Sequence, residues 1–245
     1  MSADALFEVR GLTKRFRGLT ALSEVSFQIA SGEILGLIGP NGAGKTTLIS
    51  LISGTLYPSA GEIWFSGSRI EKLPAYRRSR LGIGRTFQVM KPFPGLSVLE
   101  NVTVGALFGS ARERKRARAE EKARSLCEFA GLARRIDQRA DMLGGPDRKR
   151  LEFAKALAME PRLLLLDEVM AGLNPVEVGE VVELIKKIRA KGVTILVIEH
   201  VMKAIRSLSD RLLVLHHGQQ IAQGAPDQVL SDPAVVEAYL GKRRQ

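Results

Sequence analysis

The chain has 245 residues, of which 45% are hydrophobic, 26% are charged and only 10 are proline, and this composition excludes a disordered or fibrous protein. A chain of this length forms one large domain or a domain with an inserted lobe. Its 37 lysines and arginines outnumber its 26 acidic residues, and the net charge of +11 is expected to attract nucleic acid or anionic lipid headgroups.

Two features of the sequence favour a cytosolic protein. Cys127 is the single cysteine, so no intramolecular disulfide forms. The opening MSADALFEVR lacks the basic flank and apolar stretch of a signal peptide, and no apolar run approaches the roughly 18 residues of a membrane span. We therefore expect a soluble chain in a reducing compartment.

The first elements expected along the chain are two strands, over residues 7–12 and 22–29. Their partial alternation of apolar and polar residues is typical of antiparallel strands. The pattern changes at residues 34–38, where a short apolar run leads through a glycine-rich turn into a helical stretch over 45–52. A strand, a tight loop and a helix are therefore predicted in this order.

The loop between that strand and that helix fits the pattern G-x-x-x-x-G-K-[ST]. Its glycines allow backbone N–H groups to turn around phosphate oxygens, and the helix start presents its positive end to them. The ammonium of Lys45 is expected to reach the outer phosphates, and the hydroxyl of Thr46 to bind Mg²⁺. The alternative is a glycine-rich turn that binds nothing. The predicted phosphate site consists of Gly39, Pro40, Asn41, Gly42, Ala43, Gly44, Lys45, Thr46 and Thr47.

Between residues 91 and 160 the strand pattern disappears, and helices are expected over 98–107, 111–130 and 148–159. The second helix carries the run RERKRARAEEKAR, with seven bases and three acids. A solvated helix face is its plainest interpretation, and a nucleic-acid stripe or a surface near the inner leaflet of a membrane are the alternatives. No aromatic residue interleaves the run, which argues against binding of single-stranded nucleic acid.

Three apolar runs in the last third of the chain, at residues 163–166, 193–198 and 212–215, are predicted to be buried parallel strands. The helix expected over 176–189 has one apolar face at helical spacing. Strands that alternate with helices make an α/β fold.

Two of these strand ends bring ionisable groups to one edge of the predicted sheet. Asp167 and Glu168 follow the first run, and Glu199 and His200 follow the second. Ligands of parallel sheets bind at the carboxyl ends of the strands. We therefore assign Asp167 to Mg²⁺, Glu168 to the attacking water and His200 to the γ-phosphate. The alternatives are an acidic helix start and a bystander histidine.

Five stretches, in this order and spacing, resemble the ATP-binding subunits of ABC transporters: GPNGAGKTT, GIGRTFQ, LLLLDE, AGLNP and ILVIEH. Within that family the chain is most similar to the cytoplasmic ATPases of branched-chain amino-acid importers, through KRFRGLTAL, RTFQ, FPGLSVLENV, GLNP and the ending IAQGAPDQVLSDPAVVEAYLG. The resemblance covers nearly the whole chain. Asn174 in AGLNP stands where many relatives have aspartate, a replacement that this subfamily shares.

The resemblance implies an α/β fold of the P-loop NTPase class, with a RecA-like parallel core sheet, an N-terminal antiparallel β subdomain and an inserted α-helical subdomain. A single ATP-binding domain would span residues 1–245. Its ATP-binding core and antiparallel part would lie in residues 1–90 and 161–245, and its helical signature subdomain in residues 91–160.

The resemblance also implies roles for single residues. Adenine would stack on Phe16, and Gln88 would bind Mg²⁺ and couple the nucleotide to the helical lobe. Glu168 would be the catalytic base, with Lys45 and His200 as further catalytic groups at the γ-phosphate.

The chain departs from the family in the signature loop, which in relatives reads LSGGQ and completes the ATP site of the opposite subunit. This chain has Leu143, Gly144, Gly145, Pro146 and Asp147 there. Gly144 removes the serine hydroxyl, Pro146 has no N–H to donate, and Asp147 repels an anion unless it points away. A register shifted by one residue keeps both glycines but puts Leu143 at the serine position. We expect one competent and one weakened site, unless the helix start and the remaining amides suffice.

ATP and Mg²⁺ are the cofactors that the resemblance implies, held between two ATPase subunits in a homodimer or heterodimer. The implied partners are membrane permeases and, indirectly, a periplasmic or extracellular binding protein, which places the chain in the cytoplasm on the inner face of the cell membrane. The substrate would not touch this chain, so a branched-chain amino acid, another amino acid, an amide and urea all stay open.

Two other functions compete with amino-acid import. An ATPase of lipid or lipopolysaccharide export is similar around the P-loop, but RTFQ and the ending of the chain argue against it. A soluble ABC ATPase that acts on nucleic acid or ribosomes fits the charge of +11. Such proteins usually carry two ATP sites or a long coiled coil, and neither pattern occurs here, so nucleic acid is not expected as a partner.

Overall fold

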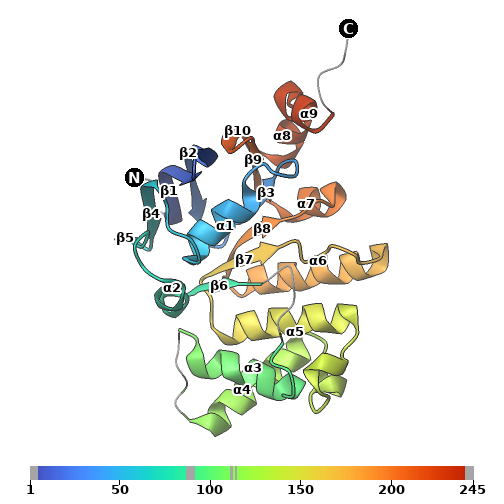
Figure 1. Ribbon diagram of the computed structural model, residues 1–245. Coiled ribbons are helices and arrows are strands. Elements are labelled where there is room, and N and C mark those ends of the chain that lie inside the picture. Colours follow the sequence, from blue (N-terminus) through green and yellow to red (C-terminus); the bar gives the residue numbers. More distant parts are fainter. Residues whose placement is uncertain (1–4, 87–91, 111–112, 114, 241–245) are drawn as a thin grey trace.

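The computed structural model describes residues 5–86, 92–110, 113 and 115–240 of the chain. Two sheets lie next to each other, and a group of helices, green to yellow, forms the lower end of the molecule (Figure 1). None of the helices in these ranges combines the length and the hydropathy that a membrane span requires.

The first sheet is antiparallel, with the strand order β2-β1-β4-β5. Its strands are β1 (Ala5–Phe16), β2 (Leu19–Ala30), β4 (Ala60–Phe65) and β5 (Ser68–Arg69). The two predicted antiparallel strands are confirmed, but each is 12 residues long. Register shifts, one of them between Val9 and Leu12, break the alternation of inward and outward side chains, so a strict period of two detects only part of each strand.

The second sheet has the strand order β10-β9-β3-β8-β7-β6, and all its pairs are parallel except that of β9 with β10. Its strands are β3 (Ile34–Ile38), β6 (Ile83–Arg85), β7 (Leu163–Asp167), β8 (Thr194–Ile198), β9 (Arg211–His216) and β10 (Gln219–Gly224). The predicted parallel strands and the α/β fold are confirmed. The buried runs of β3, β7 and β8 have no polar face because both faces of the sheet are covered.

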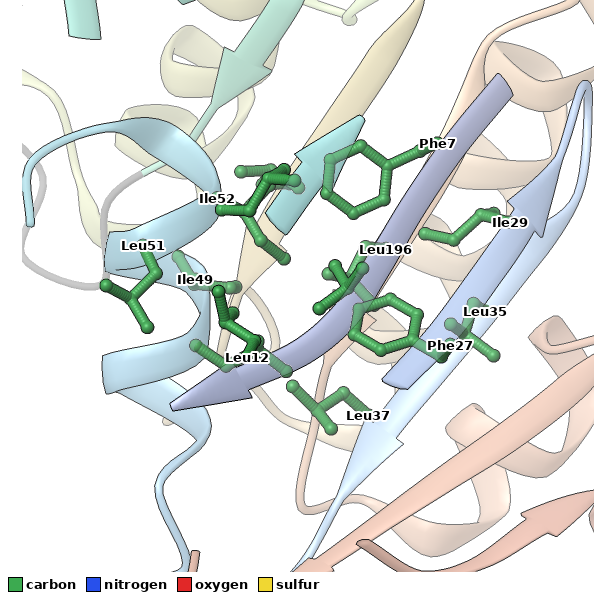
Figure 2. Close-up of a cluster of buried hydrophobic side chains, with 14 of the residues drawn as sticks. Phe7, Leu12, Phe27, Ile29, Leu35, Leu37, Ile49, Leu51, Ile52 and Leu196 are labelled. Atoms are coloured by element: carbon green, nitrogen blue, oxygen red, sulfur yellow. The ribbon is translucent and has the colours of Figure 1, made fainter. Parts of the chain in front are cut away.

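One face of the core sheet packs on α1 (Lys45–Ser53) and on the antiparallel sheet. The buried side chains between them come from both sheets and from α1, as Figure 2 shows: Phe7, Leu12, Phe27, Ile29, Leu35, Leu37, Ile49, Leu51, Ile52 and Leu196. Because α1 packs in this buried layer, the loop at its N-terminus has a fixed position. The opposite face packs mainly on α6 (Pro175–Ala190) and α7 (Met202–Leu208).

The helical lobe consists of α3 (Val98–Phe108), α4 (Arg116–Phe129) and α5 (Gly145–Ala158), with short 3-10 turns at Ala133–Arg135 (η1) and Ala140–Met142 (η2). These helices share a hydrophobic cluster of their own. Side chains of α5 join that cluster and also the cluster on the core sheet. The helix α5 therefore connects the lobe to the sheet.

The structure corrects two predicted helix boundaries. The helix predicted over 111–130 begins at Arg116, where its first i,i+4 ion pair forms with Glu120 at 2.7 Å. The helix predicted over 148–159 begins at Gly145, so Pro146 lies in its first turn. Proline is well tolerated there because its φ suits a helix and its missing N–H would have no partner within the helix.

Four helices are not among the predicted elements: α2 (Ala75–Leu81), α7, α8 (Pro226–Ser231) and α9 (Pro233–Leu240).

Candidate functional site

The predicted phosphate loop runs from the end of β3 to the first turn of α1. Gly39 has a φ of +151° and Gly44 a φ of +104°. A Cβ atom on Gly39 would lie 2.1 Å from the carbonyl oxygen of Leu215, and one on Gly44 would lie 2.8 Å from that of Ala21. Side chains are excluded at both positions, so the backbone of the loop curls tightly around the N-terminus of α1.

Lys45 lies inside this loop with only 6% of its surface exposed. Its Nζ donates hydrogen bonds to the carbonyl oxygens of Gly39 at 2.6 Å and Pro40 at 2.9 Å. Burial lowers the pKa of the Lys45 ammonium, and the carboxylates of Glu168 and Asp167 partly oppose that shift. A polyanion in the loop would stabilise the charged ammonium, which makes this side chain a strong electrostatic partner for phosphate.

A cavity of about 540 Å³ lies over the loop. Its walls include Thr46 and Thr47 at the start of α1, Glu168 beyond β7, and Phe16 at the end of β1. Phe16 is 41% exposed, and the Nζ of Lys14 lies 4.9 Å from the centre of its ring. The cavity has the size of a nucleotide site, and the exposed ring of Phe16 can stack on a planar base.

Asp167 ends β7 and is 3% exposed. Its Oδ2 accepts a hydrogen bond from Nη2 of Arg85, on the neighbouring strand β6, at 2.9 Å. The carboxylate of Asp167 and the hydroxyl of Thr46 are oxygen donors of the kind that Mg²⁺ prefers. The parts of the chain that the structure describes hold no cluster of three His, Cys, Asp or Glu side chains suited to a metal. This donor set fits Mg²⁺, which commonly takes one or two protein oxygens and completes its shell with phosphate and water.

Glu168 and His200 form a close pair at the same edge of the sheet. The Nε2 atom of His200 lies 2.7 Å from Oε1 of Glu168. Glu168 has a φ of +51°, a left-handed conformation that costs a residue with a side chain about 1–2 kcal/mol. Its backbone N–H donates to the carbonyl oxygen of Ile198 at 3.0 Å, which fixes this conformation. The predicted meeting of two strand ends thus occurs, and it holds a carboxylate against an imidazole.

The signature loop begins the helix α5. Gly144 is the N-cap residue, at φ −69° and ψ 167°, where a serine hydroxyl would cap the helix. This geometry favours the register in which Gly144 replaces the serine and Pro146 the second glycine. Pro146 contributes no N–H, so the first turn has one amide fewer to offer to an anion.

The carboxylate of Asp147 points toward two arginines. Its carboxylate lies 3.3 Å from Nη1 of Arg150 and 3.6 Å from Nε of Arg135. Two guanidinium groups therefore offset its charge, and the expected repulsion toward an anion is weakened. Leu143, the residue before the cap, is 3% exposed and packs in the cluster of the helical lobe.

Sequence reasoning missed Arg85 and gave Glu199 no role, although both contact the site. Arg85 lies within the RTFQ stretch, but its ion pair with Asp167 joins residues that are 82 positions apart. Glu199 is 2% exposed and accepts a hydrogen bond from the backbone N–H of Met170 at 2.8 Å. The sequence signal for Glu199 is an acidic residue directly after a buried apolar strand. Gln88, for which we predict magnesium binding, lies outside the described residues.

The chain is similar to known proteins along almost its whole length. Residues 22–171 match the family described as "ABC transporter", and residues 219–244 match "Branched-chain amino acid ATP-binding cassette transporter". The chain is 38% identical to the high-affinity branched-chain amino acid transport ATP-binding protein LivG of Escherichia coli, covering 97% of this chain and 98% of LivG. It is 36% identical to the lipopolysaccharide export system ATP-binding protein LptB of Acidithiobacillus ferridurans, with 98% of each covered.

Among solved structures, the chain is similar to the ADP conformation of an ATP-binding cassette of an ABC transporter. The TM-score is 0.87 and the sequence identity is 32%, over 97% of this chain and 99% of the other. The arrangement of the two sheets therefore has a counterpart in a protein whose structure is described as an ADP conformation.

Proposed function

The chain belongs to the ABC transporter family of ATP-binding proteins, of the branched-chain amino-acid type, and we propose that its ATP hydrolysis drives uptake of a branched-chain or chemically related amino acid. The family, the fold and the ATPase activity that the sequence predicts are confirmed by the comparisons. The residues, the metal, the partners and the transported substrate belong to our proposal.

Hydrolysis follows from the geometry at the edge of the core sheet. The amides of the phosphate loop and Lys45 bind the phosphates, and Phe16 stacks on the base. The 2.7 Å contact between His200 and Glu168 carries the proposal, because it holds a carboxylate oxygen beside the phosphate cavity. Glu168 orients a water and accepts its proton as the water oxygen attacks the γ-phosphorus, and ADP leaves with its bridging oxygen.

When bound, Mg²⁺ would neutralise charge on the phosphates, held by Thr46, Asp167 and Gln88. Arg85 orients Asp167 through its Oδ2. Lys45 exchanges its two carbonyl partners for phosphate oxygens when the nucleotide enters. These residues bind and position the nucleotide, whereas Glu168 acts on the water.

The experiment that tests the assignment is Glu168→Gln. The amide keeps the size of the side chain but cannot accept the proton. We expect hydrolysis to fall about 100-fold or more while ATP affinity stays within about threefold of the wild type. Equal losses of affinity and of rate would contradict the assignment of Glu168.

We also propose a docking place for a membrane permease in a groove of about 360 Å³ between β6 and the helical lobe. Phe93 and Phe108 line it, with 45% and 67% of their surfaces exposed, and Arg85 reaches it from the Asp167 side. A helix of the permease with apolar residues would cover these rings. Through this contact the chain would lie in the cytoplasm on the inner face of the membrane. Loss of permease co-purification in Phe108→Asp would support the groove.

In this proposal residues 1–245 form one ATP-binding domain, with its core in 1–90 and 161–245 and its signature subdomain in 91–160. It pairs with a second ATPase subunit, identical or different. The signature loop of this chain then faces the nucleotide of the partner, and with Gly144 and Pro146 it offers neither a hydroxyl nor a full set of amides.

Lipopolysaccharide export is the second candidate, because the identity to LptB, 36%, is close to the identity to LivG, 38%. The match of residues 219–244 to the branched-chain amino acid family favours import. Uptake of labelled leucine that depends on this chain would support import, whereas co-purification with lipopolysaccharide-exporting permeases would support export.

A further inference from the structure

The segment that follows Glu168 is held by two ionisable side chains from other parts of the fold. Glu199, directly after β8, accepts the backbone N–H of Met170 at 2.8 Å. Lys149, on α5, donates from Nζ to the carbonyl oxygen of Ala171. Two consecutive residues of the loop after β7 are therefore tied, one to the residue after β8 and one to α5, the signature helix that begins at the signature loop.

The two side chains also act on each other. Burial raises the pKa of Glu199 to about 7, although the N–H groups of Met170 and His200 and the charge of Lys149 lower it. Burial lowers the pKa of Lys149, against the attraction of Glu199 and of Glu177 on α6. A carboxyl that is 2% exposed and a half-buried ammonium are costly to desolvate, and each offsets part of the cost of the other.

This arrangement connects the signature helix α5 with the pair of Glu168 and His200. Lys149 lies in the second turn of α5, whose N-cap is Gly144 of the signature loop. Glu199 is the neighbour of His200, and the loop that it holds begins with Glu168. The loop that follows Glu168 is thus bonded to α5 through Lys149 and to the residue before His200 through Glu199.

We infer that Glu199 and Lys149 are positioning residues for ATP hydrolysis, which brace the loop over residues 168–171 so that the place of the signature helix sets the orientation of Glu168. The inference rests on the proposed roles of Glu168 and of the signature loop. Neither residue is among those that line the phosphate cavity, so the brace acts on the rate of the chemical step and not on ATP affinity.

The test is a double-mutant cycle with Lys149→Met and Glu199→Leu, in the chain assembled with its partner subunits. Each change should lower kcat about tenfold, with KM and the affinity for a non-hydrolysable ATP analogue within about twofold of the wild type. The double variant should be no slower than the slower single variant, because the loop over residues 168–171 is already released when either of its two ties is cut.

Conservative variants separate positioning from a merely structural role. Lys149→Arg keeps the charge and should restore kcat to within about threefold of the wild type. Glu199→Gln keeps an acceptor for the N–H of Met170 and should lie between Glu199→Leu and the wild type. Lys186→Met removes one partner of a surface ion pair with Glu183 and serves as the matched control, with unchanged kcat.

Hydrogen exchange of the Met170 amide gives a readout that needs no hydrolysis. We expect faster exchange in Lys149→Met and Glu199→Leu at unchanged global stability. Independent, multiplicative losses of kcat, or losses that follow the melting temperature and are not restored by Lys149→Arg, would overturn the inference. A wild-type assembly without ATPase activity would count against the proposed function, while unchanged Met170 exchange would count against the brace.

Discussion

The Nε2 atom of His200 lies 2.7 Å from Oε1 of Glu168, although 32 residues separate the two in the chain. The contact exists because β7 and β8 are neighbours in the core sheet and end at the same level, where Asp167 pairs with Ile198. Glu168, the first residue after β7, lines the phosphate cavity, and His200, the second residue after β8, lies against it. The imidazole thus contacts a carboxylate that has 19% of its side chain exposed and orients it at the cavity wall.

Replacing His200 by alanine should remove the group that orients Glu168. We expect kcat to fall about 100-fold, because the water is no longer held in line, while ATP affinity stays within about threefold. Steady-state hydrolysis and equilibrium binding of an ATP analogue measure the two quantities separately. A loss confined to affinity would instead make His200 a simple binding residue.

Arg85→Met should destabilise the fold through the carboxylate that it leaves behind. The side chains of Arg85 and Asp167 are 13% and 4% exposed, and breaking a buried pair at one partner costs about 3–5 kcal/mol. Chemical denaturation measures the loss. Arg116→Met is the control, since Arg116 and Glu120 pair on the surface with 76% and 40% of their side chains exposed and contribute less than about 1 kcal/mol. Equal effects of the two changes would refute the buried pair.

The stability of the chain should depend on pH through Glu199. Its pKa in the folded protein is about 7, above the ordinary 4.5, so folding favours the protonated carboxyl. This contribution is present at low pH and is lost as pH rises from about 4.5 through 7. Glu199→Gln lacks this contribution. The free energy of unfolding of the variant, relative to that of the wild type, should therefore rise by about 2 kcal/mol between pH 5 and pH 8. Denaturant titrations at both pH values test this, and a constant difference would contradict it.

Much of the site could be predicted because each part of it is a local pattern at a strand end. The phosphate loop is contiguous, and Asp167, Glu168 and His200 each follow an apolar run that marks its own strand. The antiparallel sheet was predicted only in part, because bulges in β1 shift its alternation and β5 has only two residues.

The rest depends on contacts between distant residues, which no local pattern marks. The pair of Arg85 with Asp167 needs the parallel pairing of β6 and β7. Asp147 is predicted to repel an anion unless it points away, and only the fold brings Arg135 from a 3-10 turn to its side. The effect of Pro146 also depends on where α5 begins, and that start lies at Gly145, before the predicted one at residue 148.

The signature loop should respond to restoration of the family pattern. Gly144→Ser with Pro146→Gly returns a hydroxyl and an N–H to the first turn of α5, each worth about 1–3 kcal/mol toward an anion. In a dimer whose own Glu168 is replaced by Gln, only the nucleotide at the partner's phosphate loop is hydrolysed, and its rate should rise at least about fivefold. With the partner's catalytic glutamate replaced instead, the same two changes should have no effect. An unchanged rate in the first assembly would show that the present loop is already sufficient.

The central claim is that the loop around Lys45 binds the tail of a triphosphate. Equilibrium titration of the purified chain with a fluorescent ATP analogue, with and without Mg²⁺, tests it most directly. We predict saturable binding that Mg²⁺ strengthens and that Lys45→Ala weakens at least about 30-fold, because the variant loses its buried ammonium. Binding that is the same in Lys45→Ala and in the wild type, or that does not saturate, would contradict the account.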